Sequence, residues 1–295
     1  MNRFKPTTWL RATLLAVPVL ATQVAITQLQ IETGLHPLAV AVAAEGDKQP
    51  ERETRRTPAL RNEVYEKLTE AQEAAEAKDL ATAKRILDEM IANSGKKALN
   101  SYEMANVYNL YAFIQYSKED YAGALKSYEK VVSQPDIPVA MEINTRFTIA
   151  QLYFVQEQWQ QGIDAMLKWF SMTDKPNANA YILLAQGYYQ VKDYDKALVN
   201  VDKAIAMSKA ANQIPKEQWL NLARFLYFEK NDIKNTEAVL EELLTYYPKK
   251  EYWVQLSHMY GEQEKTSEQL AALETAYVQS MLDKDNEQVM MAYLY

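Results

Sequence analysis

The sequence predicts an all-α protein built from stacked helical hairpins. The 295 residues include only 7 Gly, while the good helix formers Ala, Leu, Glu, Lys and Gln are abundant, so helix is favoured throughout. Two residue patterns also recur along the chain, which indicates a repeating unit. The 20 Tyr suit such a stack, because a tyrosine ring fills apolar space while its hydroxyl stays at the edge.

The first pattern is a small residue, three others and a large apolar residue. Its first members are spaced 41, 38, 35, 39 and 33 residues apart, and the small residue is degraded to Gln in the last copy. The copies are Ala83/Leu87, Ala124/Tyr128, Gly162/Met166, Ala197/Val201, Thr236/Leu240 and Gln269/Leu273.

The second pattern lies upstream of most of these pairs and reads aromatic, x, x, apolar, small, x, x, apolar. The clear copies are Tyr181-x-x-Leu184-Ala185-x-x-Tyr188, Trp219-x-x-Leu222-Ala223-x-x-Leu226 and Trp253-x-x-Leu256-Ser257-x-x-Tyr260. Weaker copies are Tyr108-x-x-Tyr111-Ala112 and Ile149-Ala150-x-x-Tyr153. A short turn sequence stands between the two patterns, at Glu119-Asp120-Tyr121, Glu157-Gln158-Trp159 and Lys192-Asp193-Tyr194.

The order and period of these patterns resemble the tetratricopeptide repeat family, whose unit is a helix–turn–helix of about 34 residues. The resemblance covers about residues 61–283, although the first unit near 61–93 is degenerate and the units run longer than 34 residues. Pro248 stands where the family often ends a unit, and Pro135 and Pro176 lie close to such positions. The resemblance implies a right-handed α-solenoid of about six repeats over residues 58–284, with residues 285–295 as a final helix.

The patterns have a physical reason in packing. A small residue at Ala112, Ala150, Ala185 or Ala223 lets the two helices of one hairpin approach closely, while the large residues fill the space to the next hairpin. One hairpin cannot bury its apolar face alone, so the units are expected to stack. An ordinary helical bundle is the alternative, and two patterns recurring in one order argue against it.

The two ends of the chain carry different signals. Three basic residues, an apolar stretch from Ala12 to Ile26 and the spacing of Ala41 and Ala43 predict a signal peptide over residues 1–43, cut after Ala43. A cut after Ala21, or an uncleaved membrane anchor, remains an alternative. Residues 44–57 predict a disordered linker, and Thr57-Pro58 predicts the start of the first helix. The final helix at 285–295 either caps the stack, docks on a partner or begins a further repeat.

The composition of the chain disfavours several classes of partner and of chemistry. The net charge is −7, or −9 once residues 1–43 are removed, and basic clusters are missing, which disfavours nucleic acid and anionic membranes as partners. The chain has no Cys, and beyond residue 43 its single His is His258, so structural zinc and nucleophilic triads have few candidate residues. Phosphate-binding glycine motifs are also missing. We therefore expect no catalysis, no metal and no cofactor.

The resemblance implies a concave groove lined by the first helices of successive units. Groove positions, counted from the matched pattern, combine amide and aromatic side chains with one basic residue. Some members of the family hold a C-terminal carboxylate with several Lys, Arg and Asn residues, and such a clamp is not expected here. Amides can bond a peptide backbone, and aromatic rings supply apolar anchors. The predicted partner-binding residues are Asn109, Phe113, Tyr116, Asn144, Phe147, Gln151, Phe154, Asn179, Gln186, Tyr189, Arg224, Tyr227 and His258. Ile182, Leu220 and Val254 occupy further positions of the same set. Phe147, Tyr116 and Tyr189 could instead belong to the core.

These features predict a periplasmic scaffold that binds a protein or peptide partner through an apolar or extended segment, with no membrane span if the leader is cleaved. In overall arrangement the chain loosely resembles exported repeat proteins of TonB-type energy-transduction systems. The alternative is an accessory subunit of an envelope enzyme or assembly complex, whose partner supplies the chemistry.

Overall fold

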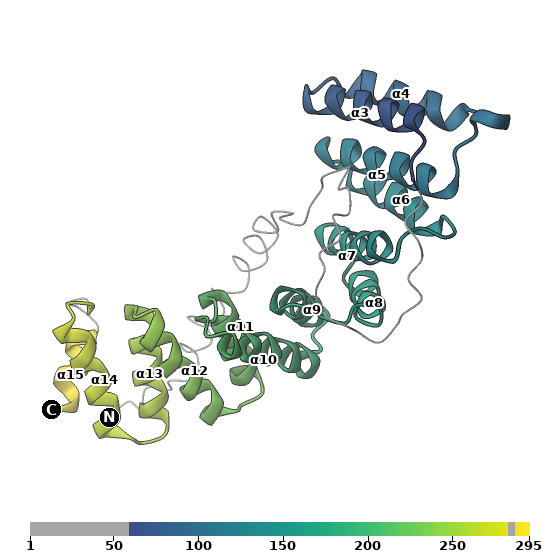
Figure 1. Ribbon diagram of the computed structural model, residues 1–295. Helices are drawn as coiled ribbons and strands as arrows, with labels where there is room; N and C mark the ends of the chain where they lie inside the picture. Colours follow the sequence, from purple (N-terminus) through teal and green to yellow (C-terminus); the bar gives the residue numbers. More distant parts are fainter. Residues whose placement is uncertain (1–58, 283–286) are drawn as a thin grey trace. The chain divides into compact units, whose positions relative to one another are not determined.

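The computed structural model describes residues 59–282 and 287–295, and this part of the chain is an all-α helical repeat fold (Figure 1). It divides into two compact units, with the boundary after residue 175. The N-terminal unit contains α3 (Asn62–Glu76), α4 (Leu80–Ala92), α5 (Ser101–Ser117), α6 (Tyr121–Ser133), α7 (Val139–Val155) and α8 (Trp159–Phe170), with a 3-10 turn at Gly95–Lys97. The C-terminal unit contains α9 (Ala178–Gln190), α10 (Tyr194–Ala210), α11 (Glu217–Glu229), α12 (Ile233–Tyr246), α13 (Lys250–Glu262), α14 (Thr266–Val278) and α15 (Glu287–Leu294).

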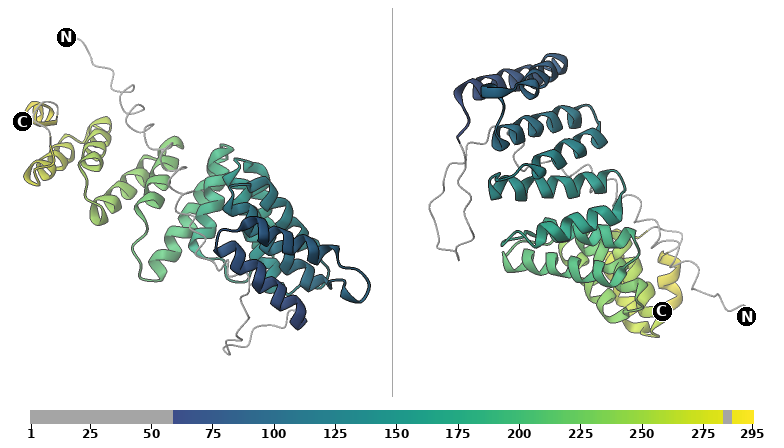
Figure 2. Two further views of the ribbon diagram at one scale, coloured as in Figure 1. Left: turned by 90° about the horizontal axis from the view of Figure 1, so that it is seen from above. Right: turned by 90° about the vertical axis from the view of Figure 1, so that its right-hand side faces the viewer.

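Consecutive helices pair into six hairpins, from α3–α4 to α13–α14, and α15 packs against α14. This confirms the predicted number of units and the predicted final helix. Within the N-terminal unit the helices form successive layers, as the right-hand view of Figure 2 makes clear. The predicted signal peptide and linker lie outside the described residues.

The first helix begins later than the sequence predicts. Ala59, Leu60 and Arg61 are not helical, so α3 starts at Asn62 rather than at Pro58. Arg61 has an extended backbone, and its backbone N–H and guanidinium both donate to the carboxylate of Glu103 on α5, with a shortest distance of 2.6 Å. This long-range bond fixes the chain before the helix begins, and the Thr-Pro signal could not reveal it.

The hairpin turns all have one geometry. The second residue after each first helix adopts a left-handed conformation, with φ between 57° and 62°, at Lys78, Glu119, Glu157, Lys192, Asn231 and Glu264. The next residue donates its backbone N–H to the carbonyl five positions earlier at 2.8–2.9 Å, which closes the end of the first helix as a Schellman-type turn. In four of the six turns this residue is an aspartate that caps the second helix. The three predicted turn sequences are confirmed, and three further turns share their geometry.

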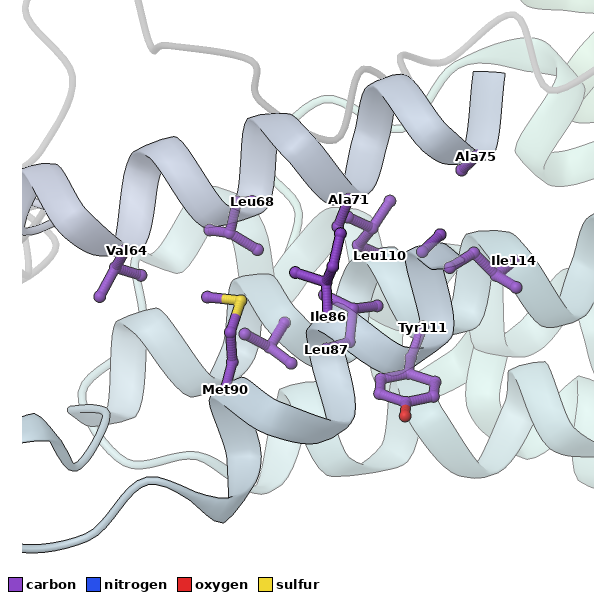
Figure 3. Packing of buried hydrophobic residues seen from close by; sticks show 12 residues of the cluster. Val64, Leu68, Ala71, Ala75, Ile86, Leu87, Met90, Leu110, Tyr111 and Ile114 are labelled. Carbon is purple, nitrogen blue, oxygen red and sulfur yellow. The ribbon is translucent and has the colours of Figure 1, made fainter. Parts of the chain in front are cut away.

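Both sequence patterns mark the core. Ala112, Ala150, Ala185 and Ala223 are fully buried where the two helices of a hairpin meet. The large residues of the other pattern are at most 2% exposed: Leu87, Tyr128, Met166, Val201, Leu240 and Leu273. Figure 3 shows how Val64, Leu68 and Ala71 of α3 face residues of α4 and α5. A hairpin thus shares its core with the first helix of the next one, as stacking requires.

Hydrogen bonds between hairpins repeat as well. A tyrosine hydroxyl on a first helix donates a hydrogen bond to a carboxylate on the second helix of the preceding hairpin. The pairs are Tyr111 and Asp88, Tyr153 and Glu129 at 3.1 Å, Tyr227 and Asp202 at 2.7 Å, and Tyr260 and Glu241 at 3.4 Å. At Asp202 burial raises the pKa, and the bond from Tyr227 only partly offsets this. The spacing of 19 to 25 residues along the chain hides this pairing from inspection of single helices.

Gly162 illustrates the close approach within a hairpin. A Cβ atom there would lie 2.5 to 2.9 Å from ring carbons of Phe154, a side chain that is only 2% exposed. We predict that Gly162→Ala lowers the free energy of unfolding by about 1–3 kcal/mol, because overpacking outweighs the usual gain from Ala in a helix. Urea unfolding followed by circular dichroism measures the change. Lys168→Ala, an exposed change on the same helix, serves as control, and a stabilising Gly162→Ala would contradict the packing argument.

The tyrosine–carboxylate bonds make a second prediction. Tyr227→Phe leaves the half-buried Asp202 without its donor and should lower the free energy of unfolding by about 1.5–3 kcal/mol. Tyr246→Phe removes an exposed hydroxyl from α12 and should stay within about 0.5 kcal/mol of the parent chain. Equal effects of the two substitutions in urea unfolding would show that the bond to Asp202 contributes nothing.

Candidate binding surface on the first helices

All thirteen predicted partner-binding residues lie on first helices. In the N-terminal unit, α5 and α7 carry seven of them: Asn109, Phe113, Tyr116, Asn144, Phe147, Gln151 and Phe154. In the C-terminal unit, α9, α11 and α13 carry the other six: Asn179, Gln186, Tyr189, Arg224, Tyr227 and His258. The hairpin pattern therefore predicted the helix of every residue, because the small residue of the pattern sets the register.

Exposure divides these residues into three groups. Asn144 and Asn179 are exposed, and three others are buried: Gln151, Phe154 and Arg224. The remaining eight are half-buried: Asn109, Phe113, Tyr116, Phe147, Gln186, Tyr189, Tyr227 and His258. A half-buried ring is fixed by its neighbours and still presents an edge or face, which suits an anchor for a partner.

In the N-terminal unit the aromatic side chains gather in pairs between first and second helices. Phe147 of α7 lies 4.8 Å from Trp169 of α8, ring centre to ring centre, and Tyr116 of α5 lies 5.5 Å from Tyr121 of α6. Phe154 belongs to the core instead, where its ring covers Gly162. The sequence could not separate Phe147 from Phe154, because both stand at first-helix positions and differ in what α8 places opposite them.

In the C-terminal unit Tyr189 is part of a three-ring cluster. Its ring centre lies 6.0 Å from that of Tyr194 on α10 and 5.5 Å from that of Phe225 on α11. Burial is the main cause that raises the pKa of Tyr189 above its ordinary value. The cluster joins two successive hairpins and leaves the ring of Tyr189 half-buried.

Amide side chains precede aromatic ones by three positions on two helices. Asn144 precedes Phe147 on α7, and Gln186 precedes Tyr189 on α9. Residues three apart share one face of a helix. Each unit therefore presents an amide that can bond a peptide backbone beside an apolar ring. The two pairs are 42 residues apart in the sequence.

A polar network on α11 and α13 surrounds Arg224. Its Nη1 donates to Gln255 Oε1 at 2.8 Å and its Nε donates to Asn221 Oδ1 at 3.3 Å, while Nη2 is buried without a hydrogen-bond partner. Burial lowers the pKa of Arg224 to about 10. The network continues from Asn221 Nδ2 to Tyr252 Oη at 2.7 Å, and from Tyr252 Oη to Glu217 Oε1 at 2.5 Å.

Sequence reasoning missed four members of this network: Glu217, Asn221, Tyr252 and Gln255. One signal was present, since residues 217, 221 and 224 follow the i, i+4, i+7 spacing of a single helix face. The partners on α13 were not predictable, because their distance from α11 depends on how the two hairpins stack.

The side chains of this surface do not form a metal site. Throughout the described ranges, no three His, Asp or Glu side chains gather closely enough to hold a metal ion. His258 is half-buried on α13. No helix within residues 59–282 and 287–295 has both the length and the apolar character needed to cross a membrane.

No protein-family model matches the sequence, and no curated protein matches it. Solved structures do match. A signal-transduction ATPase with numerous domains and a tetratricopeptide repeat sensor, from Pyrococcus horikoshii, is 18% identical with a TM-score of 0.52, over 73% of this chain and 36% of that one. The chain thus corresponds to about a third of that larger protein. YrrB, described as a tetratricopeptide protein with an unusual peptide-binding site, is 12% identical over 66% of this chain and 92% of its own, with a TM-score of 0.47.

A third similar structure is MamA from Desulfovibrio magneticus, which is 13% identical over 63% of this chain and 94% of its own, with a TM-score of 0.48. At these identities the likeness concerns the fold alone. The all-α helical repeat fold of this chain is similar to that of the matched part of the Pyrococcus horikoshii protein, which carries a tetratricopeptide repeat sensor.

Proposed function

We propose that this chain is a protein-interaction scaffold whose first helices hold an extended or apolar segment of a protein partner. The observation that carries the proposal is the pairing of an accessible amide with a half-buried ring, at Asn144 and Phe147 on α7 and at Gln186 and Tyr189 on α9. Asn and Gln side chains both donate to and accept from a peptide backbone, and the rings beside them offer apolar contact.

The same surface is proposed to be non-catalytic. General acid–base and nucleophilic chemistry depends on groups held within hydrogen-bond reach of one another and of a substrate. The chain has no Cys, and two carboxylates beside these residues are engaged: Glu217 by Lys249 at 2.6 Å and Asp202 by Tyr227. Binding, rather than turnover, is the use that these side chains support.

The proposed setting is the periplasm of a Gram-negative cell, where the scaffold would serve TonB-linked transport. This part of the proposal is supported by the basic start, apolar stretch and small-residue run of residues 1–43 and by the resemblance in overall arrangement. We predict that the mature chain begins at Ala44. Amino-terminal sequencing of the protein recovered from a periplasmic extract tests this, and a chain recovered with Met1 in the membrane fraction would contradict it.

The binding surface is tested by crosslinking in intact cells. Phe147→Ala combined with Tyr189→Ala removes one ring from each unit, and the yield of the partner crosslinked by the wild-type chain should fall at least about tenfold, as for the loss of two anchors. The matched control is Tyr65→Ala combined with Tyr246→Ala, which removes two exposed rings from α3 and α12. Circular dichroism and the urea midpoint verify that both variants are folded.

If the two double variants capture the same partner equally well, the first helices are not the site. The accessory-subunit function is then favoured, and its surface is the C-terminal end of the chain. There Tyr277 and Val278 of α14 and the terminal Tyr295 are 50%, 80% and 79% exposed. Large apolar side chains that stay exposed in this way are typical of surfaces that contact another protein.

A further inference from the structure

Arg224 is an unusual residue for the middle of a repeat. It is 1% exposed and belongs to the largest fully buried side chains of the described chain. Its two hydrogen-bond acceptors, Asn221 Oδ1 and Gln255 Oε1, are neutral amides, and Nη2 has no acceptor. Among the residues whose positions are described, no carboxylate lies within ion-pair distance of its guanidinium.

The hydrogen-bond network around Arg224 gives its guanidinium no opposite charge. The network contains two cations, Arg224 and Lys249, and one carboxylate, Glu217. That carboxylate already accepts from Lys249 Nζ at 2.6 Å and from Tyr252 Oη at 2.5 Å. Burial would raise the pKa of Glu217, but these two bonds hold it below its ordinary value. Lys249 thus has Glu217 and, at longer range, Glu251 as opposite charges, whereas the buried guanidinium of Arg224 has none in the described part of the chain.

Such a cation is costly to bury. Removing a charged side chain from water costs several kcal/mol unless an opposite charge or a full set of hydrogen bonds compensates. An apolar residue of similar size would leave the free protein equally or more stable, so packing alone does not explain an arginine here. A bound anion would relieve the cost and use the free Nη2.

We propose that Arg224 binds the carboxylate of an aspartate or glutamate side chain in the partner segment, an inference that rests on the proposed function. The carboxylate takes the place of the Gln255 amide. Gln255 is half-buried and holds Nη1, so a rotation of its side chain frees Nη1 beside the already unpaired Nη2. Two parallel N–H donors then match the two oxygens of one carboxylate, and such charge-assisted bonds are about twice as strong as the neutral bond they replace.

The site fits a side-chain carboxylate better than other anions. A glutamate side chain can reach a buried guanidinium while its own backbone stays outside, whereas a chain terminus would have to bring its backbone inside. A phosphate group carries up to two charges and calls for further cations. Lys249, the nearest other cation of the network, is engaged with Glu217.

Glutarate, a soluble dicarboxylate whose two carboxylates are far enough apart for one to bind while the other stays in water, provides the first test. At constant ionic strength, replacing chloride with glutarate should raise the Tm of the wild-type chain by about 2–4 °C. Arg224→Met should have an equal or higher Tm in chloride and should not respond to glutarate. Lys230→Met removes a cation from the end of the same helix and should respond like the wild type. The proposal is overturned if the wild type does not respond, or if Arg224→Met responds equally.

Peptides distinguish the source of the carboxylate. The probe is an N-acetylated, C-amidated heptapeptide with one glutamate between two phenylalanines, and its Kd should be about tenfold lower than that of the same peptide with glutamine. The difference should disappear in Arg224→Met. A glutamine peptide with a free C-terminus that gains equally in affinity would assign Arg224 to chain termini and overturn the side-chain proposal.

The experiments distinguish failure of the Arg224 proposal from failure of the proposed function. If Arg224→Met abolishes the glutarate response while Phe147→Ala with Tyr189→Ala leaves partner capture intact, the anion site stands and the amide–aromatic surface does not. If capture is lost in that double variant and glutarate has no effect on the wild type, the surface stands and Arg224 is a structural residue.

Discussion

Close contact between successive helices is the constraint on which this fold depends. Each hairpin has apolar residues on both sides and can bury only one of them within itself, so the other side needs the next hairpin. The contact is possible because a small residue stands at each crossing, as at Ala112 and Ala223, which are fully buried. At Gly162 there is no room even for a Cβ atom, because the ring of Phe154 occupies that space. The surface that the first helices present to solvent follows from this packing.

Polar groups within the stack differ in how they are compensated. Glu103 is fully buried and pairs with Arg61, and it also closes the capping box at Asn100, so its charge is neutralised and bonded. The tyrosine–carboxylate bonds between hairpins likewise supply a hydrogen-bond donor, as Tyr227 does for the half-buried Asp202. Arg224 is the exception, because neutral amides surround a buried cation. A stability role accounts for the first two arrangements and not for the third.

The sequence predicted much of the fold because the repeat is encoded locally. Six hairpins, their turns and the core positions follow from two short residue patterns that recur within each helix pair. The candidate surface was predicted to the level of helices, and Phe147, Gln186 and Tyr189 are half-buried on those helices. Phe154 and Arg224 are buried, and no local spacing separates them from their accessible counterparts. The start of α3 was predicted wrongly, because Glu103, 42 residues away from Arg61, decides it.

The sequence by itself determined which segments are helical, how they pair and which small residues lie between them, because each of these depends on neighbours within about one hairpin. The tertiary structure alone decided which polar side chains meet across hairpins. Asn221 and Tyr252 lie 31 residues apart in sequence and 2.7 Å apart in space, and the lack of a carboxylate beside Arg224 appears only when α11 and α13 are both in place. The physical reason is that burial and charge compensation depend on the surroundings of an atom, and in a stacked repeat those surroundings come from the next hairpin.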